Sequence, residues 1–252
     1  MRLARSLVLW SCLALLPLIP AAHAFAWENL SVAQIVERAH QREKTSQELI
    51  RDYVCQATST IREPQKDGTS KTLSIEEKTI YRKFPDQRMV KYTAVTEDGK
   101  VLTPEEVAEY QKKQGSSMSM QSNSFLGPDE RANYTYELMP PDTVKGVPSY
   151  VLRFKPKKKA KNLLDGTAWL HQDNFEIIKL TFRLAKNPKF VKELNISFDF
   201  DEVQPGCWLP VELKFNVHAG FLLFKKHFHI HEVRRDYQIN RGLPDSLFVE
   251  EE

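Results

Sequence analysis

The stretch that decides the fold is IKLTFRLAKNPKFVKELNISFDFDEVQPGCWLPVELKFNVHAG, residues 178–220. Within it, apolar side chains take every second position, and charged or polar side chains fill the positions between. The apolar positions form three runs: Ile178, Leu180, Phe182 and Leu184; Phe190, Leu194, Ile196, Phe198 and Phe200; Leu209, Val211, Leu213, Phe215 and Val217. Such alternation gives each strand one buried face and one wet face, which antiparallel sheets permit. The connections between the runs are short, which predicts a meander.

The same two-residue period occurs earlier in the chain. Residues 53–61, 73–84 and 88–96 are predicted as strands, separated by turn clusters that include Asp67-Gly68 and Pro85-Asp86. An early group of strands therefore precedes the longer meander.

Two helices are predicted. The segment SVAQIVERAHQREKTSQELI, residues 31–50, has apolar residues at helical spacing, and Ser31 with Gln34 forms a capping box. A shorter helix is predicted at residues 103–113, where Thr103 is the cap, Pro104 takes the first helical position and Glu106 closes the box.

The apolar surface of the predicted sheet exceeds what these helices can cover. Eleven of the fourteen phenylalanines lie between Phe154 and Phe248. Two helices are too few to blanket about ten long strands, so the sheet is expected to curl on itself. The predicted class is α+β, mainly antiparallel β: a curved half-barrel of about ten strands, capped by one long N-terminal helix and a short internal helix. A flexible Met-Ser-rich insertion is expected at about 114–127.

The first 24 residues have the layout of an export signal. Arg2 and Arg5 precede an apolar run, and Ala22-His23-Ala24 supplies the small residues of a cleavage site. We expect cleavage after Ala24, although an uncleaved anchor is the alternative. Residues 25–252 then form a single domain. Losing the two arginines lowers the 36 basic residues to 34 against 33 acidic ones, and this balance argues against nucleic-acid binding.

Two segments carry a family resemblance: GTAWLHQDNFEIIKL (166–180) and NPKFVKELNISFDFDEVQPGCWLPVEL (187–213). Together with the order of helices and strands, they resemble the LolA-like periplasmic outer-membrane lipoprotein-sorting proteins over about residues 30–240. The resemblance implies an open half-barrel whose concave face holds acyl chains. It also implies a carrier in the periplasm that exchanges lipoprotein acyl chains or lipid with donor and acceptor proteins of the inner and outer membranes.

The alternating pattern itself predicts which apolar side chains form this ligand-binding face. They are Leu180, Phe182, Leu194, Ile196, Phe198, Leu213, Phe215, Val217, Phe228 and Ile230. If the face is open, burial of an acyl chain gives about 0.8 kcal/mol per CH₂.

The domain has two cysteines, Cys55 and Cys207. In an exported protein a disulfide between them is favoured, and two separate buried thiols are the alternative.

Two clusters of charged or titratable residues are either binding sites or simply solvent-exposed surface. His227, His229 and His231 share one strand face, with His218 as a conceivable neighbour; a hydrated face is favoured over metal binding or a pH-sensitive face. Residues 155–161 contain five lysines. They are expected to be a solvated hairpin tip, or else Lys157, Lys158 and Lys159 contact anionic headgroups or an acidic partner.

No catalytic signature is present: the sequence has no Gly-x-Ser-x-Gly elbow, phosphate-binding glycine loop or His-Glu-x-x-His helix. The main hypothesis is therefore a monomeric, non-enzymatic carrier without a cofactor. An envelope-sensing or protein-interaction module on the same sheet is the first alternative, and a metal-dependent protein using the histidine row is the second.

Overall fold

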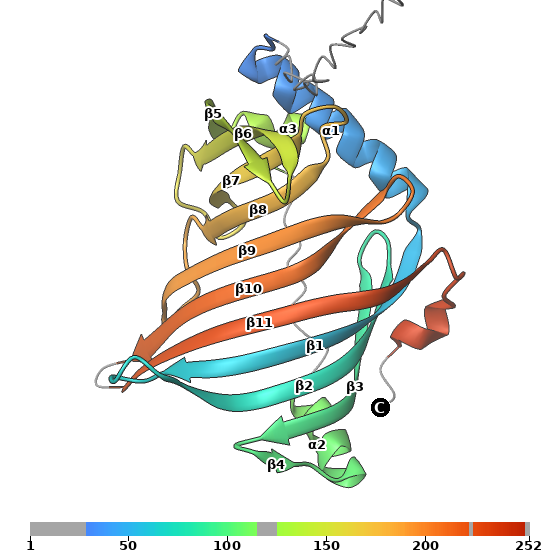
Figure 1. Cartoon of the computed structure of the whole chain (residues 1–252), viewed down its shortest axis with the longest axis vertical. Coiled ribbons are helices and arrows are strands. Elements are labelled where there is room, and N and C mark those ends of the chain that lie inside the picture. Colours follow the sequence, from blue (N-terminus) through green and yellow to red (C-terminus); the bar gives the residue numbers. More distant parts are fainter. Residues whose placement is uncertain (1–28, 115–124, 222–223, 250–252) are drawn as a thin grey trace, which may run out of the picture.

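The computed structural model describes residues 29–114, 125–221 and 224–249, in which eleven antiparallel strands form one continuous sheet (Figure 1). The strands are β1 Asp52–Pro64, β2 Ser70–Lys83, β3 Gln87–Glu97, β4 Lys100–Val101, β5 Tyr134–Val144, β6 Val147–Pro156, β7 Leu164–His171, β8 Ile177–Leu184, β9 Val191–Gln204, β10 Cys207–Phe221 and β11 Phe224–Ile239. The helices are α1 Val32–Leu49, α2 Pro104–Gln114 and α3 Pro128–Arg131, followed by a 3-10 turn at Asp245–Phe248. The predicted signal segment and residues 115–124 of the predicted insertion lie outside the described residues.

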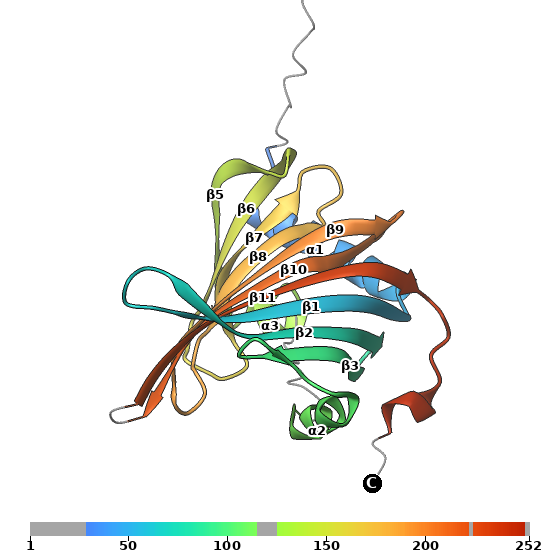
Figure 2. The ribbon, with the colours of Figure 1, turned by 60° about the horizontal axis from the view of Figure 1, so that its bottom comes forward.

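The sheet order, β4-β3-β2-β1-β11-β10-β9-β8-β7-β6-β5, is two meanders joined at one seam. Strands β5 to β11 follow one another in sequence, as do β1 to β4. The seam is the pairing of β1 with β11, which sets Tyr53 opposite Ile239 and Arg62 opposite His229. The sheet curves strongly around one face (Figure 2), so the predicted half-barrel is confirmed.

Both predicted helix starts are confirmed. The Ser31 hydroxyl and the Gln34 side chain each bond the other's backbone N–H, as in a capping box. At α2, the Thr103 N–H donates to Glu106 Oε2 over 2.8 Å, and the Glu106 N–H donates to Thr103 Oγ1 over 3.3 Å. These side chains satisfy N–H groups that the first turn leaves free.

Helix α1 is held to the sheet by an apolar stripe and an ion pair. Ile35, Val36 and Ala39 are buried against the sheet. Further along, Arg42 Nε lies 2.5 Å from Glu176 Oε1, in the turn between β7 and β8. The Ser46 hydroxyl donates to the same carboxylate over 2.6 Å.

The core has two parts, one at each end of the sheet. The larger part packs α1 against residues of β5 to β9. Within it, Phe125 stacks on Phe154 with ring centroids 3.9 Å apart. Phe125 and Leu126, at the end of the predicted insertion, are thus buried core residues. The smaller part joins β1, β2 and β3 to the start of β10 around Tyr53 and Ile80.

One glycine makes the larger core possible. A Cβ at Gly166 would overlap the carbonyl oxygen of Thr181 and lie 2.7 Å from the ring of Phe154. At position 166, strand β7 therefore approaches β8 more closely than a residue with a side chain would permit.

The predicted disulfide is wrong for this structure. Cys55 and Cys207 are both free, buried thiols of the smaller core. Cys55 lies on β1 and Cys207 opens β10, and β11 lies between these strands. Two strand spacings are about 9.6 Å, beyond the Cα separation that a disulfide spans. The alternative of two buried thiols is the one observed.

Candidate functional site

A cavity of about 810 Å³ lies on the inner face of the sheet, which is here the face that α1 contacts. Its lining includes Ala39, Ser46 and Gln47 of α1 and Gln114 at the end of α2. Residues of both core parts also line it, so the cavity lies between them. Its volume is in the range of pockets that enclose drug-sized ligands.

One side of the cavity is an apolar wall built by β8, β9, β10 and β11. Six of the ten residues predicted for the ligand-binding face line it: Leu180, Phe182, Phe198, Leu213, Phe215 and Ile230. Strand pairing explains why they converge: Phe198 is the cross-strand partner of both Leu180 and Leu213, and Phe215 is the partner of Ile230. Cross-strand partners share a face, so the alternating pattern of each strand adds to the same surface.

The other four predicted residues lie on the same face but do not line the cavity. Ile196 is buried in the larger core and Leu194 packs against it. Val217 pairs with Leu194 on one side and with Phe228 on the other, further toward the β10–β11 hairpin.

Phe198 is the centre of the apolar wall. Its ring centroid lies 5.6 Å from that of Phe182, 6.0 Å from Phe215 and 6.4 Å from Phe200, all in edge-to-face arrangements. Such arrangements hold aromatic rings in defined orientations. The wall therefore keeps its shape with the cavity unfilled.

The opposite side of the cavity is a charged wall, which sequence reasoning missed. It consists of the cavity-lining charged residues of β2, β3 and β11: Glu76, Lys78, Arg82, Arg88, Glu232 and Arg234. The signal is present in the sequence, because Ile230, Glu232 and Arg234 alternate on β11 as Glu76, Lys78, Ile80 and Arg82 do on β2. Charged residues at inner positions break the simple expectation that charges face outward.

Small residues of β1 give these long side chains room. Ser59 stands between Glu232 and Glu76 in the strand pairing, and Ala57 stands between Arg234 and Lys78. The Ser59 hydroxyl also donates to Glu232 Oε2 over 2.9 Å. Groups from strands on either side of β1 thereby meet above it.

Four of the charges form a paired network. Lys78 Nζ lies 3.1 Å from Glu76 Oε2 and 2.9 Å from Glu232 Oε2, and Arg234 Nε lies 2.7 Å from Glu232 Oε1. Burial alone would raise the pKa of Glu232, but the charges of Arg234 and Lys78 outweigh burial and lower it to about 2. Glu232 is therefore ionised at neutral pH.

Helix α2 completes this end of the cavity. The Tyr110 hydroxyl donates to Glu76 Oε1 over 2.7 Å, and its ring meets that of Tyr92 edge-on at 5.2 Å. Gln111 bonds the Tyr92 N–H and the Val90 carbonyl. Burial and the neighbouring Glu76 carboxylate raise the pKa of Tyr110, so its proton stays in place as a donor.

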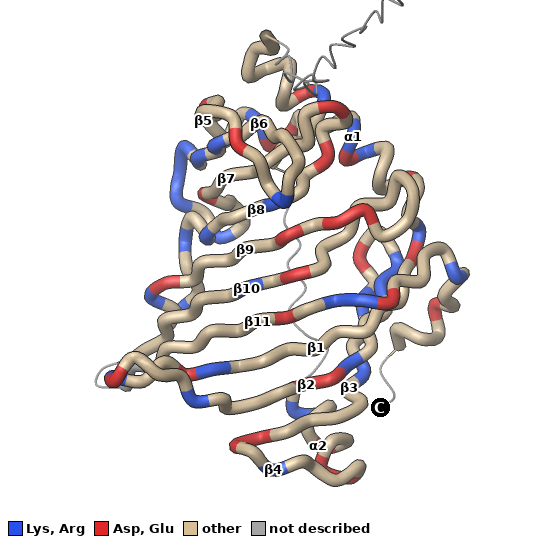
Figure 3. The backbone as a smooth tube through the Cα atoms, viewed as in Figure 1, with Lys and Arg blue, Asp and Glu red and all other residues tan. Residues whose placement is uncertain are grey.

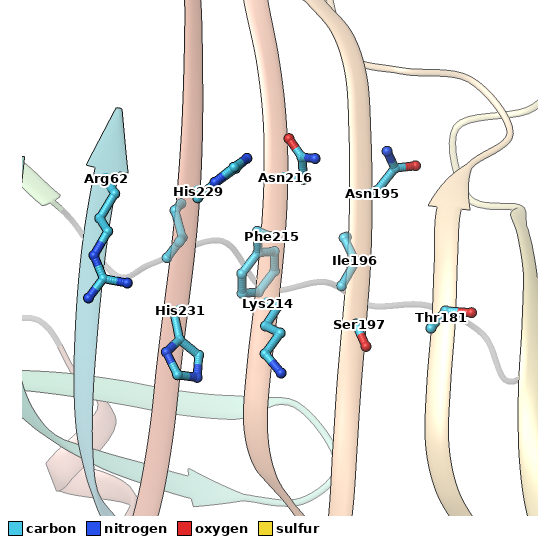
Figure 4. A pocket seen from close by; sticks show the side chains of 11 residues that line it. Arg62, Thr181, Asn195, Ile196, Ser197, Lys214, Phe215, Asn216, His229 and His231 are labelled. Carbon is cyan, nitrogen blue, oxygen red and sulfur yellow. The ribbon is translucent and has the colours of Figure 1, made fainter. Parts of the chain in front are cut away.

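The outer face carries a separate, shallower pocket of about 470 Å³ across β1, β8, β9, β10 and β11 (Figure 4). Its polar lining includes Arg62, Asn195, Asn216, His229 and His231, whose positions alternate with those of the inner face. Ile196, Phe215 and Ile230 border it as well, so Phe215 and Ile230 are shared with the cavity on the opposite side of the same strands.

The predicted histidine row lies on this outer face. The ring centroids of His218 and His227 are 3.9 Å apart, and those of His227 and His229 are 4.6 Å apart. His231 bonds Glu212 instead, with Nε2 2.7 Å from Oε1. In the part of the chain that the structure describes, no group of three or more His, Cys, Asp or Glu is placed to hold a metal ion. The row thus lacks a convergent ligand set.

The lysine cluster lies in the connection between β6 and β7, where Figure 3 shows a blue segment. Lys157, Lys158 and Lys159 are exposed. The Lys157 ammonium donates to the Ala132 carbonyl over 2.9 Å, which ties the base of the loop to α3.

Residues 87–237 match the family described as a family of unknown function (DUF5686). No curated protein matches the sequence. Among solved structures, a DUF1329 family protein from Desulfovibrio piger is similar at 14% identity, over 86% of this chain and 97% of that one, with a TM-score of 0.45. A LolA superfamily protein from Nitrosomonas europaea is similar at 14% identity, over 88% of this chain and 98% of that one, with a TM-score of 0.43.

These similarities concern the fold alone. Among the described helices, none combines the length and the apolar character needed to cross a membrane.

Proposed function

The chain belongs to the family of unknown function DUF5686, and we propose that it is a non-enzymatic carrier that binds an acylated or lipid-like ligand in the inner-face cavity. The observation that carries this proposal is the unfilled apolar wall around Phe198, which borders about 810 Å³ of space. A sheet face that served only as a core would be covered by side chains there.

The physical chemistry of the apolar wall suits an acyl chain. Phe198 and Phe215 are only half-buried, so a bound chain removes their remaining apolar surface from water. Each CH₂ transferred from water contributes about 0.8 kcal/mol. A chain of ordinary length therefore binds tightly without an ionic contact.

We further propose a route for the ligand. The N-terminal segment 1–24 directs export to the periplasm, and residues 25–252 act there as a single-domain monomer between donor and acceptor membrane proteins. The direction of transfer is toward the outer membrane, with lipoprotein acyl chains as the cargo. Exposed Lys157, Lys158 and Lys159 contact anionic headgroups or an acidic partner during transfer, at about 1 kcal/mol for each lysine.

Native mass spectrometry and lipid extraction of protein purified from its host test the carrier function. The expected result is a copurified acylated ligand, together with saturable binding of a fluorescent fatty acyl probe after delipidation. Absence of both would overturn the proposal. Replacing Lys157, Lys158 and Lys159 by Gln is expected to slow transfer to anionic vesicles and to leave probe affinity unchanged.

The outer-face pocket supports a second candidate, an envelope-sensing protein-interaction module. Its polar lining, including Asn216 and His229, lies on the side of the sheet away from the cavity. Reproducible capture of one membrane protein, lost in His229→Ala but retained in Phe198→Asp, would favour this candidate over the carrier.

A further inference from the structure

The cavity presents two chemistries to one ligand. Its apolar wall centres on Phe198, and its charged wall includes Arg82, Arg88 and Arg234. The two walls meet where Leu213 on β10 pairs with Glu232 on β11. A ligand long enough to follow the inner face therefore passes from aromatic side chains to charged ones.

The charged wall has more positive than negative charge. Four basic side chains, Lys78, Arg82, Arg88 and Arg234, face two acidic ones. Both acids are already engaged: Glu232 pairs with Lys78 and Arg234, and Glu76 accepts from Lys78 and Tyr110.

The other acidic residues that line the cavity come from α1 and the β7–β8 turn. They are Glu43, whose carboxylate lies 3.9 Å from His40 Nδ1, and Glu176, which is bonded by Arg42 and Ser46. Neither belongs to the strands of the charged wall.

Arg82 and Arg88 are two like charges of this wall that lie directly opposite one another. They are direct cross-strand partners on β2 and β3 and both line the cavity. Arg82 donates to the carbonyls of Asp86 and Pro85, over 3.3 and 2.7 Å, rather than to a carboxylate. Burial and repulsion from Arg234 lower the pKa of Arg88. Like charges placed directly opposite one another destabilise a sheet, and a bound anion would offset their repulsion.

We propose that the charged wall binds the anionic headgroup, a phosphate or carboxylate, of an amphiphile whose acyl chains lie on the apolar wall. This inference rests on the proposed carrier function and specifies its ligand. The guanidinium groups of Arg82 and Arg88 offer paired N–H donors that match phosphate and carboxylate oxygens. The paired Lys78–Glu232–Arg234 network holds the surrounding side chains in place while the headgroup binds.

The experiment compares three probes on delipidated full-length protein: dioleoyl phosphatidic acid, dioleoylglycerol with the same chains, and inorganic phosphate. Displacement of a fluorescent acyl probe reports lipid affinity, and thermal unfolding reports phosphate binding. We expect phosphatidic acid to bind about 10-fold more tightly than dioleoylglycerol, a preference that weakens as salt rises. Phosphate alone is expected to raise Tm slightly and to compete weakly with the lipid.

The double variant Arg82→Gln/Arg88→Gln is expected to lose this preference and to keep its affinity for dioleoylglycerol. Arg62→Gln, an exposed arginine of the outer-face pocket, is the matched control and is expected to change neither affinity. Arg88→Lys is expected to retain part of the preference. The salt dependence of the wild-type protein provides a test that needs no variant to fold.

The outcomes separate the two proposals. Equal, salt-independent binding of both lipids would overturn the headgroup site and leave the carrier function standing. Binding of neither lipid would overturn the carrier function itself. Tight phosphate binding that the acyl chains do not improve would overturn the amphiphile and indicate a site for the free anion.

Discussion

Lys78 Nζ lies 2.9 Å from Glu232 Oε2, although the two residues come from strands on opposite sides of β1. Both side chains are only 9% exposed. The pair therefore crosses the seam at which the two meanders join, above Ser59 and Ala57. This ion pair links the early strands to the C-terminal meander through side chains. The backbone hydrogen bonds between β1 and β11 link the same two parts of the sheet.

Breaking this pair is expected to destabilise the protein. Glu232→Gln leaves Lys78 and Arg234 buried without their shared carboxylate and should lower the free energy of unfolding by about 3 kcal/mol. Urea unfolding measures the change. Glu77→Gln is the matched control, because Glu77 is an exposed acid on the outer face of β2. Similar small effects of the two substitutions would contradict the assigned role of the network.

The same carboxylate predicts an acid-sensitive stability. The folded-state pKa of Glu232 is about 2, below its ordinary value of 4.5. Its contribution is therefore complete above about pH 4.5 and is lost as the pH falls toward about 2, a loss of the order of 3 kcal/mol. Unfolding free energies measured across this range should fall less steeply in Glu232→Gln than in the wild type. Identical slopes would show that another group controls acid unfolding.

Gly166→Ala is expected to lower stability through overpacking. The new methyl group would press against the Thr181 carbonyl and the Phe154 ring, at a cost of about 1–3 kcal/mol. A decrease in Tm of several degrees is expected. Thr167→Ala, at the next position of β7, provides the control. An unchanged melting temperature for Gly166→Ala would mean that β7 and β8 are further apart than described.

The thiols of Cys55 and Cys207 are expected to remain free. Protein that lacks residues 1–24, and with them Cys12, should take up two equivalents of a thiol reagent when denatured without reductant and should migrate on a gel like the reduced protein. In the native state Cys55 should react slowly, because burial raises its pKa to about 11. A faster-migrating form without labelling sites would show that the cysteines are bonded.

Much of the fold could be predicted from the period of the apolar residues. Alternation in residues 178–220 identifies β8, β9 and β10, and the caps at Ser31 and Thr103 identify the starts of α1 and α2. Strand neighbours within each meander follow from the short connections. The pairing of β1 with β11 could not be predicted in this way, since it joins segments far apart in sequence and depends on how the sheet curls.

The disulfide was predicted wrongly and the charged wall was not predicted, and both errors have the same cause. Both depend on the β1–β11 seam: β11 separates Cys55 from Cys207, and it brings Glu232 and Arg234 beside Lys78. Apolar patterning identifies a buried face but does not show where that face becomes charged. The apolar wall was therefore predictable, whereas the second half of the cavity required the register of the strands.

The central claim is that the inner face of the sheet, and not its outer face, binds an acyl chain. Phe198 and Ser197 are neighbours on β9 that face opposite sides: of the two pockets, Phe198 lines the cavity and Ser197 lines the outer-face pocket. We compare binding of a fluorescent fatty acyl probe to delipidated wild type, Phe198→Asp and Ser197→Asp, which place the same charge on each face in turn, with thermal unfolding as the check on folding. We predict that Phe198→Asp weakens binding by at least about 10-fold, whereas Ser197→Asp leaves it unchanged. Equal affinity for folded Phe198→Asp and wild type, or loss of binding only in Ser197→Asp, would contradict the account.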